Sequence, residues 1–529
     1  MTGFIIGLDF GTLSLRGVLI NAATGKAEAN QAADYRHGVM TSHLPSGRRL
    51  PPQYALQDAA DYSEAAESVL RHLGQGRHIL GIGLDFTASS PLPARADGTP
   101  LSALHPDEPH AYVKLWKHAA AQPLADAINA RGGDFLESCG GRLSGEWMLP
   151  KAAQIQQEAP AIWDQAARFI ESGDWMTWQL TGIERRSLDF AAYKAQYRPG
   201  ISYPDDVVPG LADRLGMPAT VGTAVGPLND DWRRRTGILG AAIVAVAVID
   251  SHAVLPAVGA VRPGAWVGAL GTSAAYLLLE DKPLPLPPGL EACAEGAVLP
   301  ELWCYEAGQA GFGDMLGWFV QTFPRDADLA RNFALYNAEA AGLAPGENHL
   351  VALDWWSGNR VPYADSHLSG LLAGFTMGTT GAGIYRALLE SLCYGAHFVK
   401  DCLTQGGLAV SEILLTSGLA HRNPLLVQIM ADVLGQDITV PALENPTAVG
   451  AAIHGAVAGG VVADFTEGAM RFGASAGTLY HCDDRQHSAY QRIYRSYRQL
   501  AEDKTVRDTL HDLNHHQQNA FLGSARDMA

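Results

Sequence analysis

An acidic side chain stands at the end of a long apolar run in the middle of the chain. Residues 241–249 are all apolar, and Asp250, Ser251 and His252 follow them. An uninterrupted apolar run predicts a strand buried on both faces of a parallel or mixed sheet. Because ligands of open α/β sheets bind just outside the carboxyl ends of strands, Asp250 is a candidate general base. Taken alone, it fits equally well an aspartate that caps the following turn.

Two glycine–threonine turns, one in each half of the chain, offer a way to bind phosphate. Gly11–Thr12 separates apolar segments 4–8 and 13–20, and Gly271–Thr272 separates segments 266–270 and 274–279. Glycine lets backbone N–H groups approach an anion closely. Further candidates near the first turn are two donors, Ser14 and Arg16, and a water-mediated Mg²⁺ ligand, Asp9. One such hairpin is a common structure, but its repetition in both halves favours phosphate binding at both.

Four further segments could contact a small ligand, and each also has a simpler interpretation. Residues 86–91 form a loop of small side chains after strand 78–85, where a polyol could lie against the backbone or where an ordinary loop could stand. Trp116 and Lys117 lie in an aromatic and basic stretch that equally fits the edge of an amphipathic helix. Lys194 is an isolated lysine, a type that is usually solvated, and Glu306 precedes glycine-rich residues 307–314, which could also be a flexible connector.

Composition limits the classes of function. The 38 Lys and Arg against 55 Asp and Glu give a net charge of −17, which argues against a nucleic-acid-binding surface. The six cysteines show no zinc-ligand spacing, and reduced thiols of a cytoplasmic protein explain them best. No apolar run approaches the roughly 20 residues that span a bilayer, and no secretory leader is apparent, so no membrane partner is expected. Walker, zincin and nucleophile-elbow motifs are also absent.

The elements that must position these residues alternate between strands and helices. The 529 residues exceed a single core and predict two α/β domains. Apolar periodicity or helix-ending signals predict helices at 61–73, 123–130, 150–159, 172–182, 383–402, 425–434 and 490–500. A strand at 413–416 enters the small-residue turn Ser417–Gly418, which could pack flat against an adenine, and Asn423 precedes the next helix. The polar tail after residue 500 is expected to fray.

These pieces, in this order, resemble the FGGY carbohydrate kinases, and within them the ribulokinase group. The resemblance extends from Ile6 to about Tyr497. The residues that carry it are Gly7–Thr12, Asp250, Gly271–Ser273, Ser417–Gly418 with Asn423–Pro424, Asp85–Pro91, Lys114–His118, the Lys194 segment and Glu306–Asp314. It implies two ribonuclease-H-like domains of the actin-like ATPase type, each with a mixed central sheet, and an active-site cleft between them. The expected divisions are 1–255 for sugar binding and the first phosphate hairpin, 256–500 for ATP binding, and 501–529 for the tail.

The resemblance also implies roles for individual residues. Asp250 would take the proton from a terminal hydroxyl, and Asp9 would hold Mg²⁺ through water. Substrate contacts are expected from Ala88, Trp116, Lys117, Lys194, Asp250 and Glu306. Contacts with ATP are expected from Gly11, Thr12, Ser14, Arg16, Gly271, Thr272, Gly313, Gly418 and Asn423. The sequence departs from many members of the family at Val248–Ile249 and at Ser417, where those members have glycine, so the placement of adenine is open.

The implied activity is ATP-dependent phosphorylation of the 5-hydroxyl of a ketopentose. The substrate favoured by the resemblance is L-ribulose, and the corresponding pathway is L-arabinose catabolism. Alternatives within the fold are xylulose, D-ribulose or ribitol as the substrate. A reading of a different class is a non-catalytic actin-like nucleotide switch, and a third is a degenerate kinase that senses sugar without turnover. The presence of Asp250 and of both turns disfavours the third reading. The resemblance further implies a homodimer.

Overall fold

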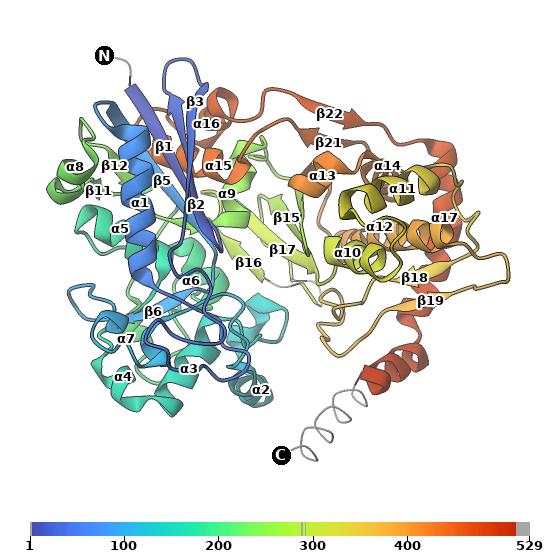
Figure 1. The fold of residues 1–529 in the computed structure, drawn as a ribbon, viewed down its shortest axis with the longest axis horizontal. Helices are drawn as coiled ribbons and strands as arrows, with labels where there is room; N and C mark the ends of the chain where they lie inside the picture. Colours follow the sequence, from blue (N-terminus) through green and yellow to red (C-terminus); the bar gives the residue numbers. More distant parts are fainter. Residues whose placement is uncertain (1–2, 287–288, 291, 515–529) are drawn as a thin grey trace.

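The computed structural model describes residues 3–286, 289–290 and 292–514. It contains two large sheets of seven strands each, which lie in two lobes (Figure 1). The first sheet comprises β1 (Gly3–Phe10), β2 (Ser14–Asn21), β3 (Ala27–Asp34), β5 (His78–Phe86), β11 (Ala224–Pro227), β12 (Ile243–Ala245) and β13 (Val248–Ile249). The second comprises β14 (Ala265–Leu270), β15 (Ala274–Glu280), β16 (Ala292–Glu295), β17 (Trp303–Gln309), β20 (Glu412–Thr416), β21 (Ile438–Pro441) and β22 (Gly477–Tyr480). Both sheets mix parallel and antiparallel pairs, as expected.

The two sheets repeat one topology. In the first, the order is β11-β12-β5-β1-β2-β3, and in the second β22-β21-β20-β14-β15-β17 can be read in the same sense, with β16 added at the edge. The hairpin β1–β2 is antiparallel and β1 is parallel to β5, just as β14–β15 is antiparallel and β14 is parallel to β20. The internal repeat that the two glycine–threonine turns predicted is therefore a repeat of whole half-sheets.

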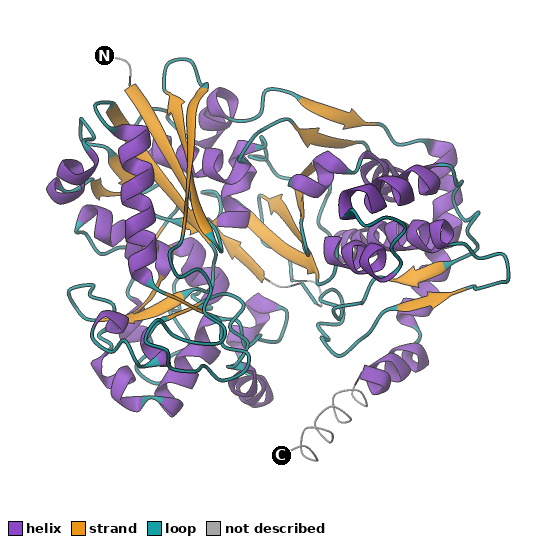
Figure 2. Cartoon of the chain, in the orientation of Figure 1, coloured by secondary structure: helices purple, strands orange, loops and turns teal. Residues whose placement is uncertain are grey.

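Helices flank the strands of both sheets (Figure 2). In the first half they are α1 (Ala59–Gly74), α2 (Gln122–Arg131), α3 (Met148–Glu158), α4 (Pro160–Gln165), α5 (Ser172–Thr181), α6 (Leu188–Lys194), α7 (Ala212–Leu215), α8 (Asp230–Thr236) and α9 (Asp250–Ala257). In the second half they are α10 (Gly313–Thr322), α11 (Leu329–Ala341), α12 (Gly381–Gln405), α13 (Gly418–Arg422), α14 (Pro424–Leu434), α15 (Pro446–Ala458), α16 (Phe465–Phe472) and α17 (Asp484–Glu502). Short strand pairs lie outside the large sheets: β4 (Leu56–Gln57) with β7 (Val113–Lys114), β6 (Pro91–Ala94) with β8 (Arg168–Glu171), β9 (Arg186–Ser187) with β10 (Pro218–Ala219), and β18 (Val351–Leu353) with β19 (Leu371–Ala373).

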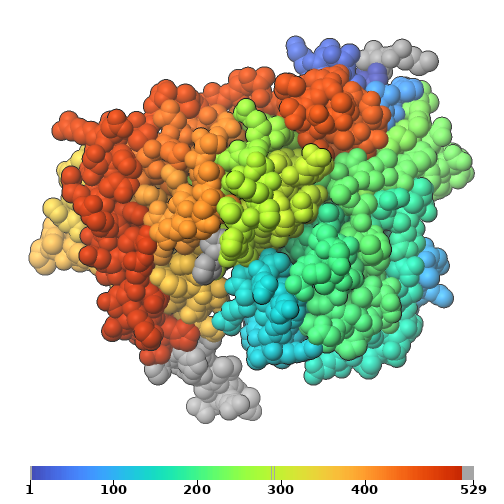
Figure 3. Space-filling view, turned by 180° about the vertical axis from the view of Figure 1, so that it is seen from behind, coloured from blue at the N-terminus to red at the C-terminus, as the bar shows by residue number. Residues whose placement is uncertain are grey.

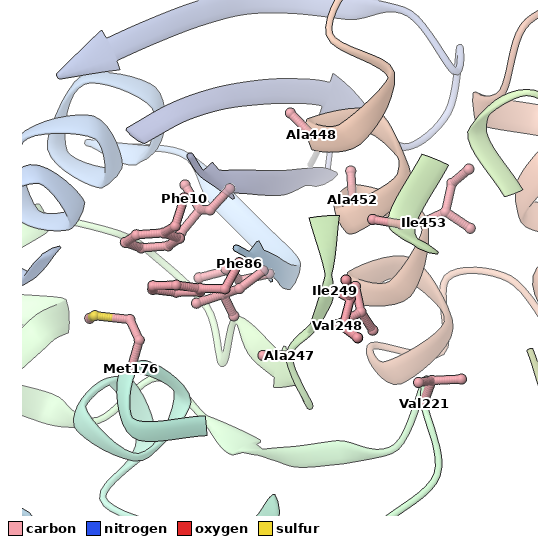
Figure 4. Close-up of a cluster of buried hydrophobic side chains, with 14 of the residues drawn as sticks. Phe10, Phe86, Met176, Val221, Ala247, Val248, Ile249, Ala448, Ala452 and Ile453 are labelled. Carbon is pink, nitrogen blue, oxygen red and sulfur yellow. The ribbon is translucent and has the colours of Figure 1, made fainter. Parts of the chain in front are cut away.

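Helix α15 comes from the second half of the chain but packs on the first sheet. A Cβ atom added at Gly7 would lie 1.8 Å from the Ala448 carbonyl oxygen, and one at Gly83 would lie 1.7 Å from that of Ala451. The helix can approach β1 and β5 this closely only because both strands present glycine there. Side chains of α15 join the first-lobe core around the stacked rings of Phe10 and Phe86 (Figure 4). From behind, the red-orange segment with α16 lies beside the blue N-terminal strands (Figure 3).

Several predicted elements differ from the observed ones. The run 241–249 forms two short strands, β12 and β13, because its pairing with β5 is interrupted between Val244, opposite Ile82, and Val248, opposite Asp85, where three residues of the run face two of β5. Residues 113–114 form strand β7, so the alternative of an amphipathic helix around Trp116 is wrong. Residues 307–309 belong to β17, which leaves only 310–312 as a glycine-containing loop. Residues 504–514 of the tail are helical, so the expected fraying is wrong for them, and residues 515–529 lie outside the described residues.

The expectations for cysteines and membrane spans can be compared directly with the structure. All six cysteines are free thiols, and three of them, Cys139, Cys304 and Cys393, are buried. Within the described ranges no helix is both long and apolar enough to cross a bilayer. The division at residue 255 stays a prediction. Helices α15 and α16 belong to the predicted second domain by sequence, but they pack on the first lobe.

Candidate active site

A cavity of about 710 Å³ brings together side chains from both halves of the chain. Of the predicted site residues, Thr12, Ala88, Trp116, Lys194, Asp250 and Glu306 line it. Lys117 is exposed and is not among the lining residues. The wall also includes polar residues that the sequence did not single out, among them Arg142, Asn359 and Arg360. The candidate base and the threonine of the first turn therefore line the same cavity.

Asp250 lies at the end of a strand of the first sheet, where it lines this cavity. It follows β13 and is the first residue of α9, and its Oδ1 accepts a hydrogen bond from Ser251 N–H at 2.7 Å. Burial, and next the negative charge of Asp9, raises the pKa of Asp250 to about 6. A carboxylate with a pKa just below neutrality can accept a proton at physiological pH and still be charged beforehand.

Lys194 and Glu306 form an ion pair across the cavity. Lys194 ends α6 and Glu306 lies on β17, and their Nζ and Oε2 atoms are 3.4 Å apart. Burial by itself would raise the pKa of Glu306, but the positive charges of Lys194 and then His252 outweigh it and hold that pKa below its ordinary value. The pair therefore presents a charged donor and a charged acceptor side by side. Such a pair can bind the adjacent hydroxyl groups of a polyol.

Each glycine–threonine turn is closed by a hydrogen bond from its own glycine, over three residues in the first turn and over two in the second. Gly11 N–H donates to the Ser14 carbonyl at 3.1 Å, and Gly271 N–H donates to the Ser273 carbonyl at 2.9 Å. The N–H group of each turn glycine is thus engaged inside its own hairpin. Thr12 and Ser14 are half-buried, whereas Arg16 is exposed, with its Nη1 atom 3.9 Å from Asp9 Oδ2.

The second turn lies at the exposed end of two interior strands of the second sheet, β14 and β15, and does not line the cavity. The Thr272 carbonyl accepts from Phe312 N–H at 2.9 Å and the Gly271 carbonyl accepts from Gly313 N–H at 3.0 Å. A Cβ atom at Gly313 would lie 2.6 Å from the Gly271 oxygen, so only glycine fits there. The predicted ATP residues Gly271, Thr272 and Gly313 are therefore in mutual contact.

The predicted adenosine turn packs against the same strand end. Ser417 Oγ donates to the Leu270 carbonyl, and Gly418, which starts α13, is exposed. Ser417 has a φ of +87°, so it occupies a backbone region that favours glycine. Asn423 is buried, and its Oδ1 accepts from Leu426 N–H at 3.1 Å to cap α14. Its side chain therefore has a structural contact whatever its role toward a nucleotide.

Comparison with known proteins places the chain in a family. A sequence model of the FGGY family of carbohydrate kinases, C-terminal domain, matches residues 267–459. Ribulokinase from Bacillus licheniformis is 36% identical over 521 residues, which cover 92% of this chain and 94% of that protein. Ribulokinase from Mycolicibacterium smegmatis is 37% identical over 527 residues, with 94% and 93% covered. The chain belongs to the FGGY carbohydrate kinases. It is thus a sugar kinase whose substrates are a sugar and ATP.

Solved structures confirm the FGGY fold. Xylulose kinase from Rhodospirillum rubrum superimposes with a TM-score of 0.83 at 22% identity and covers 97% of this chain and 100% of that one. Glycerol kinase from Plasmodium falciparum, solved with ADP, has a TM-score of 0.79 at 14% identity, with 95% and 99% covered. At these identities the likeness concerns the fold alone. It agrees with the two repeated half-sheets and the cavity between the lobes.

In this FGGY kinase, the loop that carries Ala88 is held by a buried lysine that the sequence analysis missed. Lys151 of α3 is fully buried, and its ammonium group donates to the carbonyls of Ser89 at 2.6 Å and Leu115 at 2.8 Å. Glu171 Oε2 accepts from Ser90 N–H at 2.9 Å on the other side of the loop. Ser89 itself has a φ of +55°. No sequence signal marks Lys151, because a lysine in a helix normally faces solvent.

Asp85 is a second residue that sequence reasoning did not place in the site. Strands β1 and β5 pair so that Asp9 lies directly opposite Asp85, and Val248 of β13 is the neighbour of Asp85 on the other side. Burial, followed by the charges of Asp9 and Asp250, raises the pKa of Asp85 well above its ordinary value. The strand-end argument that selected Asp250 applies equally to Asp85, so this residue could have been found from the sequence.

The first hairpin and the sugar loop are also linked directly. Trp116 is 40% exposed in the cavity and its Nε1–H donates to Thr12 Oγ1 at 3.1 Å. Trp116 N–H in turn donates to Ser90 Oγ at 3.2 Å. Trp116 therefore bridges the predicted phosphate turn, through its indole, and the predicted sugar loop, through its backbone, in this kinase.

Proposed function

We propose that this FGGY kinase is a ribulokinase, which transfers the γ-phosphoryl group of ATP to the 5-hydroxyl of L-ribulose and gives L-ribulose 5-phosphate. The observation that carries the proposal is that Asp250, the Lys194–Glu306 pair and Thr12 share one cavity. The sequence relatives named ribulokinase support the choice of L-ribulose. The corresponding physiological role is in L-arabinose catabolism, in the cytoplasm.

The residues divide the reaction between them. Asp250 orients the 5-hydroxyl and accepts its proton as the oxygen attacks the γ-phosphorus. Lys194 and Glu306 hold hydroxyl groups of the sugar, with Ala88 and Trp116 completing the wall. Backbone groups of the turns at Thr12 and Thr272 contact the phosphates, and closure of the lobes excludes water so that hydroxyl rather than water attacks.

The residues around Asp9 fit a divalent cation. Asp9 is 6% exposed, Asp85 is fully buried, and among the described residues no donor reaches either carboxylate oxygen of Asp85. Two adjacent carboxyl groups, for which Arg16 at 3.9 Å from Asp9 supplies one positive charge, offer oxygen ligands of the kind that Mg²⁺ prefers. No three His, Cys, Asp or Glu side chains of the described ranges converge as a metal cage, and Mg²⁺ commonly keeps water and phosphate ligands. Asp9 would hold the ion through water, and the bound ion would neutralise charge on the phosphates.

A substrate panel tests the proposal. The purified chain is given ATP and Mg²⁺, and ADP release is followed with L-ribulose, D-ribulose, L- and D-xylulose, ribitol and glycerol. We expect the highest kcat/KM with L-ribulose and a phosphorus–carbon coupling to C5 in the NMR spectrum of the product. A higher kcat/KM with another member of the panel would reassign the substrate within the fold. ADP release that no sugar increases would contradict the kinase proposal.

The same preparation tests the rival readings. A nucleotide switch of the filament-forming kind would scatter light when ATP is added, whereas a kinase would not. We also propose a homodimer, which multi-angle light scattering checks through the mass in solution.

A further inference from the structure

One buried carboxylate contacts the chain on both sides of Asp250. Asp189 lies in α6 and is fully buried. Its Oδ2 accepts a hydrogen bond from Ile249 N–H at 2.8 Å, and its Oδ1 lies 2.7 Å from His252 Nδ1. Ile249 immediately precedes Asp250 and His252 follows two positions later. The two hydrogen bonds of Asp189 therefore bracket the candidate base.

We propose that Asp189 is a positioning residue for the catalytic base, whose carboxylate fixes the strand-to-helix turn that presents Asp250 to the sugar. The inference rests on the proposed role of Asp250 as that base. Asp189 is not among the residues that line the cavity, so it would act on the base without touching the substrate.

The turn that carries Asp250 pairs with β5 through two residues only and has few side-chain hydrogen bonds of its own. Strand β13 consists of Val248 and Ile249 alone, and the N-cap of α9, Ile249, offers no side-chain hydrogen bond. The Asp250 carboxylate is itself bonded to the next N–H group, that of Ser251. Small torsional changes at Ile249 would move the carboxylate by about an ångström, and a misplacement of that size costs on the order of 10²-fold in rate. The external bond to Ile249 N–H prevents such changes.

We call the two contacts of Asp189, with Ile249 N–H and with His252 Nδ1, the clamp. His252 supplies the second of them. Its ring is 1% exposed and packs edge-on against Tyr193 at 4.6 Å. The charged groups that face it are Asp189 and Lys194 from α6, Asp250 from its own helix and Glu306 from β17. Burial opposes protonation, but the charge and hydrogen bond of Asp189 outweigh it and raise the pKa of His252. The Asp189 carboxylate thus faces Nδ1 of this ring and favours a positive charge on it, beside the base.

Helix α6 connects this clamp to the sugar. Asp189 stands near its start and Lys194, which pairs with Glu306, ends it. The helix starts at the Ser187 cap, whose Oγ accepts from Asp189 N–H at 3.2 Å. One seven-residue element therefore carries both the group that aligns the base and a group that contacts the sugar.

A double-mutant cycle tests the proposal. Asp189→Asn, Asp250→Asn and the double variant are assayed with the sugar that the wild-type enzyme phosphorylates fastest. Asparagine keeps the shape of Asp189, so the fold should persist, but its single carbonyl oxygen can accept from Ile249 N–H or from His252 Nδ1–H and cannot replace both carboxylate oxygens. We expect Asp189→Asn to lower kcat at least tenfold with the KM for ATP changed less than twofold. Because Asp189 acts through Asp250, the double variant should be no slower than Asp250→Asn alone.

Glu390→Gln is the matched control. Glu390 is equally buried and also bonds a cation, Arg386, at 2.8 Å, but it lies in α12 of the second lobe. This variant should lose thermal stability and keep kcat. Additive losses in the cycle, or wild-type kcat in Asp189→Asn, would overturn the positioning role. A wild-type enzyme that phosphorylates no member of the panel would instead refute the proposed function.

A pair of His252 variants tests the second contact separately. In His252→Asn the amide NH₂ can take the place of the Nδ1–H donor, whereas His252→Leu removes the donor. The asparagine variant should retain at least five times the kcat of the leucine variant at equal KM for ATP. Equal kcat values in the two variants would overturn the two-sided clamp.

Discussion

At the scale of single residues, Asp250 shows what a sequence can reveal about a site. Its place after an apolar run and its residue type were enough to mark it, since strand ends are where open sheets bind ligands. Its pKa of about 6 could not be foreseen, because burial and the charge of Asp9 depend on segments far away in the sequence. The same limit explains why Lys151 and Asp189 were missed: their partners are set by the fold.

The raised pKa predicts the pH dependence of the reaction. Asp250 must be deprotonated to accept a proton, and its base form is populated above about pH 6. We therefore expect kcat/KM to fall about tenfold per pH unit below that value and to level off above it. Asp250→Asn should lose roughly 10²–10⁴-fold in kcat and bind ATP as before. Steady-state rates from pH 5 to 8 check this, and a flat profile in the wild type would exclude Asp250 as the titrating base.

The Lys194–Glu306 pair predicts a separation of the two substrates. Glu306→Gln keeps the shape of the side chain but removes the charge that faces Lys194 at 3.4 Å. The KM for sugar should rise several-fold while the KM for ATP stays within twofold, because the pair lies away from the second turn. Initial rates with each substrate varied in turn provide the measurement. An unchanged KM for sugar would place Glu306 outside the binding contacts.

Ser417 predicts an effect on stability. A non-glycine residue at its φ of +87° is strained by an estimated 1–3 kcal/mol, and its hydroxyl bond to the Leu270 carbonyl offsets part of this. Ser417→Gly relieves the strain and loses the bond, whereas Ser417→Ala only loses the bond. The glycine variant should therefore be more stable than the alanine variant by about 1 kcal/mol in urea unfolding. The opposite order would contradict the strain at this turn.

At the scale of elements, the sequence predicted the paired hairpins and seven of the seventeen helices α1–α17, because their signals are local. Gly182 ends α5 in the left-handed conformation, as the sequence of the helix suggested. Elements whose form depends on neighbours were predicted less well. Residues 241–249 read as one strand because burial on both faces looks alike whether or not every residue stays in the ladder. Trp116 and Lys117 read as part of a helix edge, yet the buried Lys114 before them belongs to a strand.

The sugar loop gives a prediction at this scale. Lys151→Met would free the carbonyls of Ser89 and Leu115 and leave Glu171 buried without its cation, at a cost of roughly 3–5 kcal/mol. The KM for sugar should rise about tenfold, which corresponds to roughly 1.4 kcal/mol of lost binding free energy, with little change in the KM for ATP. Adding Glu171→Gln should recover stability, measured by thermal unfolding, but not the KM for sugar. Lys282→Met, at an exposed lysine, is the control.

At the scale of the whole molecule, the proposed closure of the two lobes would take place around the cavity that both of them line. Trp116 is 40% exposed there and bridges the phosphate turn and the sugar loop. Saturating sugar should therefore shift its fluorescence to shorter wavelength as water leaves the cavity. Trp116→Phe keeps an aromatic ring and should lose the shift, which separates this residue from the other ten of the 11 tryptophans. A shift that persists in the variant would place the sugar-linked change elsewhere.

The contact of α15 with the glycines of β1 and β5 has a consequence for how the polypeptide can be divided. The chain leaves the first lobe after α9, returns with α15 and α16, and leaves again at β22, so covalent links join the lobes at three points. A fragment that stopped at residue 255 would expose to water the sheet surface at Gly7 and Gly83 that α15 covers. The remaining fragment would carry α15 with its apolar side chains exposed. The two parts should precipitate when produced apart and regain activity only when refolded together.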